Sequence, residues 1–340
     1  MAKKEISDSL KIKKIAEAAN VSEMVVKRAL CDYRNISPES KKKVLKVAEE
    51  LGLSISTPSC DVAIILPAMP EYFWFKFSKF LEKYAKESKL KYRFFSYTSV
   101  KDYQDLLHCI EKAENAKAKV YIIVGQKFPQ VEEKIRCIAE GKPVILLEEY
   151  LEIENTCYVG ENSFESGYEL CKLYFKEYSR DKKILVVRSS IDNGNNGRLA
   201  GFCKALEDMN MPTPSYVDVQ RGNRIVASAI ARKLSQMGEE CDCIYSPSGY
   251  LSECCNAVIK LKSNKEFHCI GFESNKLTNK YCKTGLIKLI IDQDMEGQSR
   301  EAICLASECL KYGKMPDKKC VYVKSKPVDL DELSESEKEE

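Results

Sequence analysis

The sequence contains only two histidines and one tryptophan among its 340 residues. His108 and His268 stand far apart in the chain, so a histidine-based catalytic triad is not expected. Dinucleotide-binding, Walker and nucleophile-elbow motifs are also missing, and the glycine-rich stretch 193–197 fits a loop before a helix better than a phosphate cradle. We therefore predict that the chain is not an enzyme.

Long apolar runs are missing as well. The longest strongly apolar run, Val62 to Leu66, is far shorter than the ~20 residues that span a bilayer. The N-terminus carries lysines with no apolar segment behind them, which argues against a secretory signal and against an exported solute-binding protein. A cytoplasmic location without a membrane partner is therefore expected.

The 16 cysteines include no Cys-x-x-Cys pair. Structural zinc sites usually need Cys or His residues two to four apart, so neither a metal site nor another cofactor is expected. In a reducing compartment we expect these cysteines to remain thiols and to act as small apolar core residues.

Charge is distributed unevenly along the chain. Residues 1–55 hold 12 Lys/Arg against 8 Asp/Glu, residues 56–328 hold 41 against 36, and residues 329–340 hold 1 against 7. A small basic segment in front of a nearly neutral body is typical of a module that binds a polyanion. The acidic tail has little apolar content, which favours a solvated, disordered end.

The basic segment has the pattern of three short helices. The first is expected over Lys11–Ala19, the second starts at the N-capping Ser22, and the third starts at Ser37-Pro38 and closes at Gly52. This is the layout of a helix-turn-helix, in which the second helix enters the major groove of DNA. A three-helix bundle without a nucleic-acid function would show the same periodicity.

Particular residues distinguish these two interpretations. The segment contains Ile12-Lys-Lys-Ile15-Ala16, Ala19-Asn-Val21-Ser22, Val26-Lys-Arg28-Ala-Leu30 and Ala48-Glu-Glu-Leu51-Gly52. With Ile36-Ser37-Pro between them, these stretches resemble the LacI family of bacterial transcription regulators over some forty residues without a gap. The resemblance implies a sequence-specific contact with double-stranded operator DNA.

The resemblance also implies which residues contact DNA. Ser22 would cap the recognition helix and contact phosphate, and Arg28 would contact a base. The full candidate set is Ser22, Glu23, Met24, Val25, Lys27, Arg28, Arg34, Asn35 and Ser37. Glu23, Met24 and Val25 form an unusual base-reading turn, because Glu accepts from a cytosine amine while Met and Val pack on a thymine methyl or another apolar edge. The operator sequence therefore cannot be predicted from the operators of other family members.

The segment after Gly52 departs from the family. In the family a Tyr-x-Pro-Asn stretch leads into a hinge helix that inserts a leucine into the minor groove. Here residues 53–60 read Leu-Ser-Ile-Ser-Thr-Pro-Ser-Cys, and about a dozen family residues are missing. No helix can be built from this segment, so we expect the wedge and its DNA bend to be absent. A short linker would then couple head and body only weakly.

From residue 61 onward, apolar runs alternate with amphipathic segments. Strands are expected at 61–66, 91–96, 120–124, 144–147, 184–188, 216–218, 243–246, 268–272 and 286–291, with helices such as 75–88, 102–115, 163–178 and 198–209 between them. Such alternation predicts parallel sheets with helices on both faces. Ligands of such folds bind beyond the carboxyl ends of the strands.

Four motifs in this body point to one architecture. They are Tyr158-Val-Gly-Glu161-Asn162, Arg198-Leu-Ala-Gly201-Phe202, Ile270-Gly-Phe-Glu273 and Ile291-Asp-Gln293-Asp. In this order they resemble the periplasmic-binding-protein-like effector domain of LacI regulators. The implied fold class is an all-α helix-turn-helix followed by a two-lobed α/β domain with parallel sheets, which clamps its ligand between the lobes.

The domain boundaries follow from these patterns. We expect a helix-turn-helix at 1–55, a linker at 56–60, a two-lobed domain at 61–328 and an acidic tail at 329–340. Lobe one would comprise about 61–159 and 291–317, and lobe two about 160–288 and a final strand at 320–324.

The resemblance implies an effector pocket as well. Its candidate residues are Phe73, Trp74, Glu161, Arg198, Ser248, Glu273 and Gln293. Carboxylates accept hydroxyl donors, arginine donates to oxygens and an aromatic ring stacks on a sugar face, so a sugar or related polar ligand is expected. Pro247-Ser248 replaces the Asn-Asp of the family, which removes a usual hydroxyl-binding carboxylate. Two alternatives stay open: Trp74 as a core residue and Glu161 as a solvated turn residue.

The sequence as a whole predicts a cytoplasmic, homodimeric DNA-binding regulator, a repressor, whose body binds a small-molecule effector. A dimer is expected because one helix-turn-helix buries little surface and two-fold operators pair two heads. The alternative is a DNA-binding regulator with a vestigial pocket that is controlled by a protein partner or by its abundance.

Overall fold

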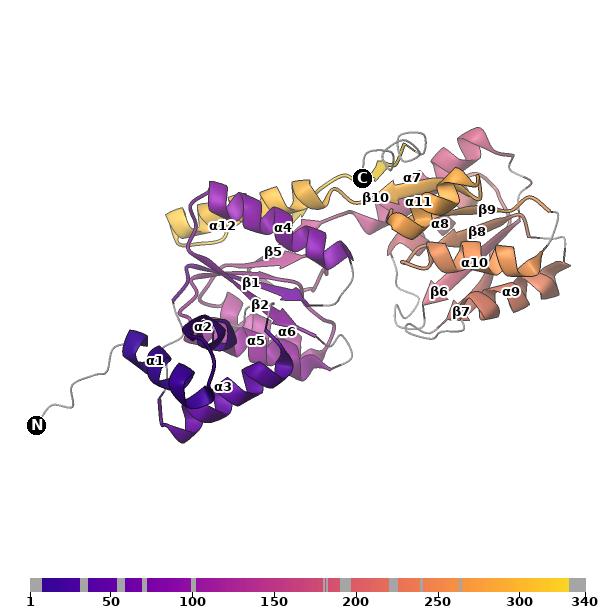
Figure 1. The fold of residues 1–340 in the computed structure, drawn as a ribbon. Helices are drawn as coiled ribbons and strands as arrows, with labels where there is room; N and C mark the ends of the chain where they lie inside the picture. Colours follow the sequence, from indigo (N-terminus) through magenta and orange to yellow (C-terminus); the bar gives the residue numbers. More distant parts are fainter. Residues whose placement is uncertain are drawn as a thin grey trace, which may run out of the picture. The chain divides into compact units, whose positions relative to one another are not determined.

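The computed structural model describes residues 8–30, 36–53, 59–68, 72–98, 102–179, 181, 183–189, 197–219, 226–238, 241–262 and 265–329. In these ranges the chain forms a small helical head and two α/β lobes (Figure 1). The chain passes from the first lobe to the second after Gly160, returns after Asp294 and passes again after Val321. The predicted fold class is confirmed.

The head consists of three helices, α1 (Asp8–Ala19), α2 (Glu23–Leu30) and α3 (Pro38–Glu50). Ile15, Val26 and Val44, one from each helix, are fully buried in its core. Asn20 follows α1 with a φ of 49°, and Gly52 follows α3 with a φ of 60°. These residues tolerate the left-handed backbone that the two sharp turns require. The three helices expected from the sequence are present.

The first lobe is a six-stranded sheet covered by helices on both faces. Its strands are β1 (Val62–Pro67), β2 (Tyr92–Tyr97), β3 (Val120–Ile123), β4 (Val144–Leu147), β5 (Thr156–Gly160) and β11 (Cys320–Tyr322), in the order β11-β5-β4-β3-β1-β2. Its helices are α4 (Tyr72–Glu87), α5 (Tyr103–Asn115), α6 (Pro129–Ala139) and α12 (Met295–Tyr312). Because strand side chains alternate, α5 and α6 cover one apolar face and α4 and α12 cover the other (Figure 1).

The second lobe repeats this plan. Its strands are β6 (Ile184–Ser189), β7 (Ser215–Val219), β8 (Cys243–Ser246), β9 (His268–Phe272), β10 (Ile287–Asp292) and β12 (Lys326–Pro327), in the order β12-β10-β9-β8-β6-β7. Its helices are α7 (Ser163–Glu177), α8 (Gly197–Asp208), α9 (Val226–Met237), α10 (Leu251–Leu261) and α11 (Lys276–Lys283). α7 and α8 cover one face of the sheet, and α9, α10 and α11 cover the other. Strand β4 of the first lobe thus corresponds in position to β9 of the second.

Two strand assignments at the lobe ends differ from the expectation. The final strand expected in lobe two at 320–324 lies in the first lobe as β11, because the Tyr158 amide donates to the Lys319 carbonyl at 2.9 Å and so places this segment beside β5. The second lobe receives β12 instead, which pairs with β10. β10 also stays entirely in the second lobe, so the chain returns to the first lobe later than expected. β5 itself was not among the predicted strands.

Several buried cysteines contribute to the apolar faces of the sheets. Burial raises the pKa of Cys157 and Cys309 to about 11 and that of Cys171 to about 12, so these thiols stay protonated at neutral pH. No helix in the described ranges combines the length and apolar character needed to cross a membrane. Residues 56–58 of the expected linker and the tail beyond Asp329 lie outside the described residues.

Candidate DNA-reading helix and effector site

The first turn of α2 presents predicted DNA contacts to solvent. Ser22 caps this helix, because its Oγ accepts a hydrogen bond from the Val25 amide at 3.3 Å. Glu23 is exposed, and Met24 exposes 57% of its surface. Val25, in contrast, is half-buried against the head core. The turn therefore offers Glu23 and Met24 for base contact, whereas Val25 mainly holds the helix to the head.

The second turn of α2 adds two cations. Lys27 and Arg28 are exposed, while the fully buried Val26 fixes which side of the helix faces solvent. Both cations also lie in the last turn of the helix, where positive charge interacts favourably with the helix dipole. The exposed side of α2 therefore carries a carboxylate, a thioether and two cations, which together suit contacts with base edges and phosphates.

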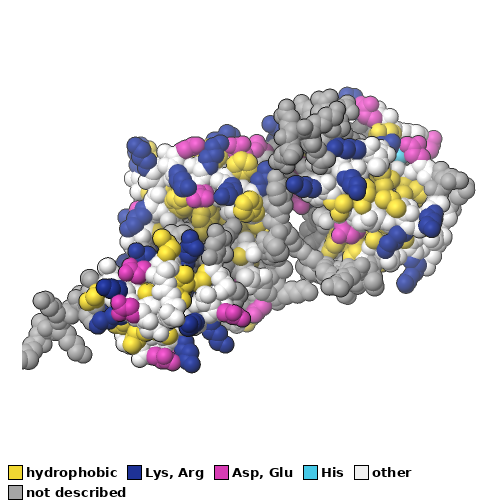
Figure 2. Space-filling view, viewed as in Figure 1, with side chains coloured by type: hydrophobic (Ala, Val, Ile, Leu, Met, Phe, Trp, Pro, Cys, Tyr) yellow, Lys and Arg dark blue, Asp and Glu magenta, His cyan; other side chains and the backbone are white. Residues whose placement is uncertain are grey.

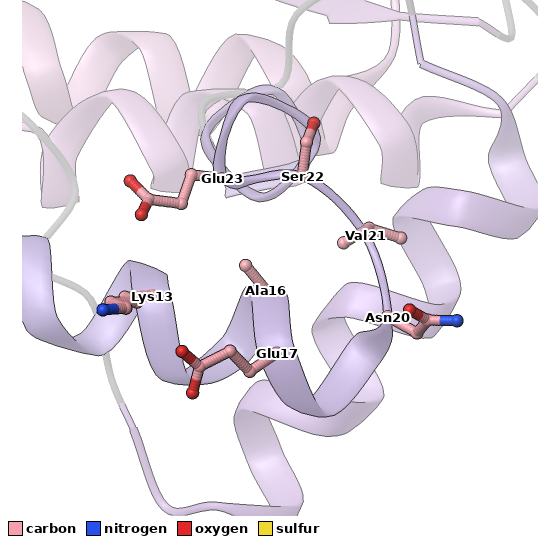
Figure 3. A pocket seen from close by; sticks show the side chains of 7 residues that line it. All are labelled: Lys13, Ala16, Glu17, Asn20, Val21, Ser22 and Glu23. Atoms are coloured by element: carbon pink, nitrogen blue, oxygen red, sulfur yellow. The ribbon is translucent and has the colours of Figure 1, made fainter.

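A hollow of about 490 Å³ lies between α1 and the start of α2. Figure 3 shows its lining residues, which are Lys13, Ala16, Glu17, Asn20, Val21, Ser22 and Glu23. Glu17 and Glu23 bring two carboxylates to this hollow against the single ammonium group of Lys13, so its charge disfavours a bound phosphate. Acidic and basic side chains are both visible on the head in Figure 2. Phosphate contact is better suited to the exposed ammonium group of Lys27.

The predicted contacts around the start of α3 are only partly described. Ser37 caps α3, because its Oγ accepts from the Ser40 amide at 3.2 Å and donates to the Ser40 Oγ at 2.9 Å. Arg34 and Asn35 lie outside the described residues. The role of this tip in DNA contact stays a prediction.

In the second lobe, α7 and α8 meet backbone to backbone at two glycines. A Cβ atom on Gly201 would lie 1.8 Å from the Phe164 carbonyl oxygen, and one on Gly167 would lie 1.9 Å from the Arg198 carbonyl oxygen. Only glycine allows such an approach. Glu161 immediately precedes the cap of α7, and Arg198 is the second residue of α8, so this packing brings their side chains together.

Arg198 lies at the centre of a buried charge cluster. Its Nε donates to Glu161 Oε1 at 2.5 Å, and its Nη1 donates to the Pro247 carbonyl at 3.2 Å. Nη1 also lies 3.6 Å from Glu273 Oε1, and the guanidinium carbon lies 4.0 Å from the centroid of the Phe272 ring. The side chains of Arg198 and Glu161 are only 9% and 5% exposed, so solvent and salt screen their attraction little.

Two serine hydroxyls complete the surroundings of Glu161. Ser325 Oγ donates to Oε2 at 2.8 Å, and Ser163 Oγ donates to Oε1 at 3.3 Å. The alternative in which Glu161 is a solvated turn residue is therefore wrong. A buried carboxylate needs such partners to offset the loss of hydration.

Glu273 is the carboxylate of this cluster that reaches solvent. Its side chain is 33% exposed, and its backbone has a left-handed φ of 70°, which costs about 1–2 kcal/mol in a residue with a Cβ atom. Burial raises the pKa of Glu273 and outweighs the opposing effect of the nearby Arg198 guanidinium. Strained backbone of this kind is common where a side chain must be aimed at a ligand.

The remaining predicted residues of the second lobe share one edge of its sheet. Ser248 follows β8, Glu273 follows β9 and Gln293 follows β10. Because these three strands are adjacent and parallel, the residues after them lie at the same carboxyl edge. Pro247, which replaces a polar family residue, contributes its backbone carbonyl to Arg198. The structure thus brings Glu161, Arg198 and Glu273 into contact and places Ser248 and Gln293 at the same edge.

Phe73 and Trp74 belong to α4 of the first lobe. Their rings meet edge to face with centroids 4.9 Å apart, and both are half-buried against the core under α4 and α12. They therefore have a packing role within their own lobe. Their stacking on an effector stays a prediction.

Glu148 in the first lobe was not among the residues predicted from the sequence. This residue follows β4 as Glu273 follows β9, and both have left-handed backbones, with φ values of 66° and 70°. The Glu148 amide donates to Val159 on β5 at 3.1 Å, and the Glu273 amide donates to Ile291 on β10 at the same distance. The sequence feature that could have identified Glu148 is a carboxylate directly after a buried strand, which occurs in each half of the body.

Two protein-family models match the chain in succession. Residues 11–54 match the bacterial regulatory proteins of the lacI family, and residues 62–315 match the periplasmic binding protein domain. The chain belongs to the lacI family. A lacI-family head joined to this body makes it a DNA-binding regulator with an effector domain of the sugar-binding type. No curated protein matches the chain.

Solved structures of binding proteins and of a regulator share the fold of this lacI-family member. GanP, a glucose-galactose binding protein from Geobacillus stearothermophilus, is 16% identical over 81% of this chain and 99% of its own, with a TM-score of 0.68. A putative LacI transcriptional regulator from Bacteroides fragilis is 15% identical over 81% and 99%, with a TM-score of 0.68. A Caulobacter myo-inositol binding protein is 18% identical over 83% and 97%, with a TM-score of 0.69.

Proposed function

We propose that this lacI-family regulator is a repressor that binds a two-fold symmetric operator as a homodimer and responds to a small polyhydroxylated effector. The buried Arg198 beside the partly exposed Glu273 is the observation that supports an effector site. The exposed, capped first turn of α2 supports base reading by the head.

The side chains of α2 predict part of the operator. Glu23 accepts a hydrogen bond from a cytosine amine, Met24 packs on a thymine methyl, and Arg28 donates to guanine. Each half-site should therefore contain a cytosine whose recognition depends on Glu23. Replacement by Gln, which pairs with adenine in the same groove, should change the preferred base at that position.

The DNA-binding proposal is tested by selecting binders from a random duplex library. The full-length protein is compared with protein lacking residues 1–58, at two salt concentrations. We expect a two-fold symmetric motif from the full-length chain alone, and a Glu23→Gln protein should select adenine instead of cytosine at one position per half-site. The same motif from both proteins, or no motif from either, would contradict the proposal.

The effector proposal follows from the chemistry of the second-lobe edge. Glu273 accepts hydroxyl donors, and the fixed Arg198 guanidinium donates to hydroxyl or ring oxygens. Within the first lobe, Glu148 follows β4 as Glu273 follows β9, and the predicted stacking of Phe73 and Trp74 on a sugar ring stays a prediction. Solved structures of similar fold bind glucose and galactose or myo-inositol, which makes neutral sugars and cyclitols the first probes.

Calorimetric titration with D-galactose, D-ribose, D-allose and myo-inositol tests this site. At least one probe should bind the wild type, and Glu273→Gln should weaken that binding by about tenfold, because one charge-assisted hydrogen bond is lost. Glu266→Gln, on the exposed surface of the same lobe, should leave it unchanged. Operator titration with and without the probe then gives the sign of the response, and the short linker predicts a change of less than about a hundredfold.

The second candidate is a regulator whose pocket no longer senses a ligand. Arg198 already donates to Glu161 and to the Pro247 carbonyl, so its charge is compensated within the lobe. Failure of every probe to bind, together with intact operator recognition, would favour this alternative and control by a partner or by abundance.

A further inference from the structure

The contacts that hold Arg198 extend beyond the residues already assigned to the effector site. Arg198 Nε donates to Glu161 Oε1, and Ser325 Oγ donates to the other oxygen of the same carboxylate at 2.8 Å. A chain of hydrogen bonds therefore runs from Ser325 through Glu161 to Arg198. All three side chains are at least nine-tenths buried.

Ser325 comes from a distant part of the sequence. It is the fourth residue after the third passage of the chain between lobes, and Glu161 is the first residue after the first passage. β12 follows Ser325 directly and anchors this segment by pairing with β10. One carboxylate thus joins two connecting segments within the second lobe and links both of them to Arg198.

The two serines that donate to Glu161 differ in their distance from it along the chain, so they differ in whether they can move independently of it. Ser163 lies two residues beyond Glu161, at the start of α7, so the two residues move together. Ser325 belongs to a separate segment, 164 residues away in sequence. A shift of that segment acts on Oε2, and because the carboxylate is planar, its rotation also moves the oxygen that holds Arg198.

We propose that Ser325 is a positioning residue of the effector site. Its hydroxyl orients the Glu161 carboxylate, and Glu161 holds the Arg198 guanidinium in the orientation that an effector contacts. The inference rests on the proposed effector role of Arg198 and adds the segment after the third passage to that site. Effector affinity then depends on where this segment lies relative to Glu161.

Hydrogen exchange of the Arg198 Nε proton, followed by NMR of the full-length protein, tests the positioning role without an effector. The signal is assigned by its loss in Arg198→Lys. Ser325→Ala should accelerate the exchange about tenfold, because a hydrogen bond to a charged group is lost. Ser325→Thr keeps the hydroxyl and should restore slow exchange. Ser235→Ala, which removes a hydroxyl bonded to the Ala231 carbonyl in α9, is the matched control and should have no effect.

A double-mutant comparison separates positioning from general loosening of the lobe. In a Glu161→Met background, Ser325→Ala should cause no further acceleration, because Met has no oxygen through which Ser325 and Arg198 can be connected. The proposal would be overturned if the Arg198 Nε proton of Ser325→Ala exchanged at the wild-type rate. It would also be overturned if Ser325→Ala accelerated the exchange equally with and without the Glu161 substitution. If Ser325→Ala does not fold, Ser325→Cys supplies a weaker donor of similar size. Faster exchange in that variant supports the proposal, and unchanged exchange overturns it.

A calorimetric measurement connects the positioning role to function. With the probe that binds among D-galactose, D-ribose, D-allose and myo-inositol, Ser325→Ala should weaken binding about tenfold, and Ser325→Thr should restore it. Unchanged affinity in Ser325→Ala would overturn the functional part of the inference. If no probe binds the wild type, the proposed effector site itself fails, and the exchange measurement alone decides whether Ser325 orients Arg198.

Discussion

Two arginines of the second lobe each donate to a carboxylate over a short distance, and the two pairs differ strongly in burial. Arg198 and Glu161 are 9% and 5% exposed, whereas Arg188 and Asp218 are 35% and 64% exposed. Arg188 also has good geometry, because its Nε and Nη2 both donate to Asp218, at 2.8 and 2.9 Å. Their comparison therefore contrasts a buried, multiply bonded ion pair with an exposed one.

We expect Arg198→Met to lower the free energy of unfolding by about 3–5 kcal/mol, because it leaves the Glu161 carboxylate buried without its cation. Arg188→Met should lower it by only about 0–1 kcal/mol, since water solvates Asp218 once the partner is gone. Urea unfolding followed by circular dichroism measures both changes. Similar losses in the two variants would show that burial does not control the strength of these pairs.

The raised pKa of Glu273 predicts a pH-dependent stability. A carboxyl whose pKa is higher in the folded than in the unfolded state favours folding at low pH, and that contribution is lost as pH rises through the folded pKa. Glu273→Gln should therefore be more stable than the wild type at neutral pH, and the difference should shrink toward pH ~4.

Glu266 provides the control of opposite sign, because Lys288 lowers its pKa. Glu266→Gln should be slightly less stable than the wild type at neutral pH, and this deficit should disappear on acidification. Thermal unfolding of the three proteins between neutral pH and about pH 4 gives the comparison. A neutral-pH loss of stability in Glu273→Gln would contradict the assignment.

Individual site residues were predictable to different degrees. Glu161, Arg198 and Glu273 were found because they occupy motifs of a family resemblance, and the structure brings them together. Ser325 was not found, because a serine near the end of the chain carries no local sign of a contact 164 residues away. Val25 was predicted among the base-reading residues; it is half-buried against the head core, and its contact with a base stays a prediction.

The close contact between α7 and α8 predicts the effect of a substitution at Gly201. Helix propensity alone predicts that Gly201→Ala stabilises the protein by up to about 1 kcal/mol. The new Cβ atom, however, would lie 1.8 Å from the Phe164 carbonyl oxygen, so the helices must separate. We expect a net loss of about 1–3 kcal/mol and weaker effector binding, because separation also moves Arg198 away from Glu161.

Gly141→Ala is the matched control for this change. A Cβ atom on Gly141 meets no atom within 4 Å. Its unfolding free energy should equal or slightly exceed that of the wild type. Urea unfolding of both variants measures the difference, and a stabilising Gly201→Ala would show that the helices adjust without cost.

Secondary-structure elements were predictable where the pattern is local. The buried parallel strands appear as short apolar runs, and the caps Ser22 and Ser37 mark helix starts. β11 was misassigned and β12 was missed because they have only three and two residues, none of them fully buried. Which sheet accepts so short a strand depends on hydrogen bonds to residues far away in sequence.

The proposed homodimer makes a quantitative prediction for operator binding. In the full assembly each head contributes Lys27, whose exposed ammonium suits a phosphate contact. Each phosphate contact adds about −0.9 to the slope of log affinity against log salt concentration. Lys27→Ala should therefore reduce the slope by about 2 if two heads bind together and by about 1 if one head binds.

Fluorescence anisotropy with the selected operator at four or more salt concentrations measures this slope. Lys46→Ala, on α3 and paired with Glu50 at 3.7 Å, is the control in the same head and should change the slope little. Sedimentation of the protein alone should give twice the mass of one chain. A slope change near 1 together with a monomeric protein would contradict the dimer.

The short segment that carries β11 and β12 also has a consequence for biosynthesis. β11 completes the edge of one sheet and β12 the edge of the other, so neither sheet is finished until the ribosome has made residues 320–327. The first lobe also needs α12, which is made before β11. At a synthesis rate of about 5–20 residues per second, α12 and β11 are complete only roughly 8–30 s after Gly160 has been added. The head contains its own core and precedes both lobes, so a nascent chain can fold its DNA-reading helix well before its effector domain exists. During that interval the open sheet edges are the part of the chain most in need of a chaperone.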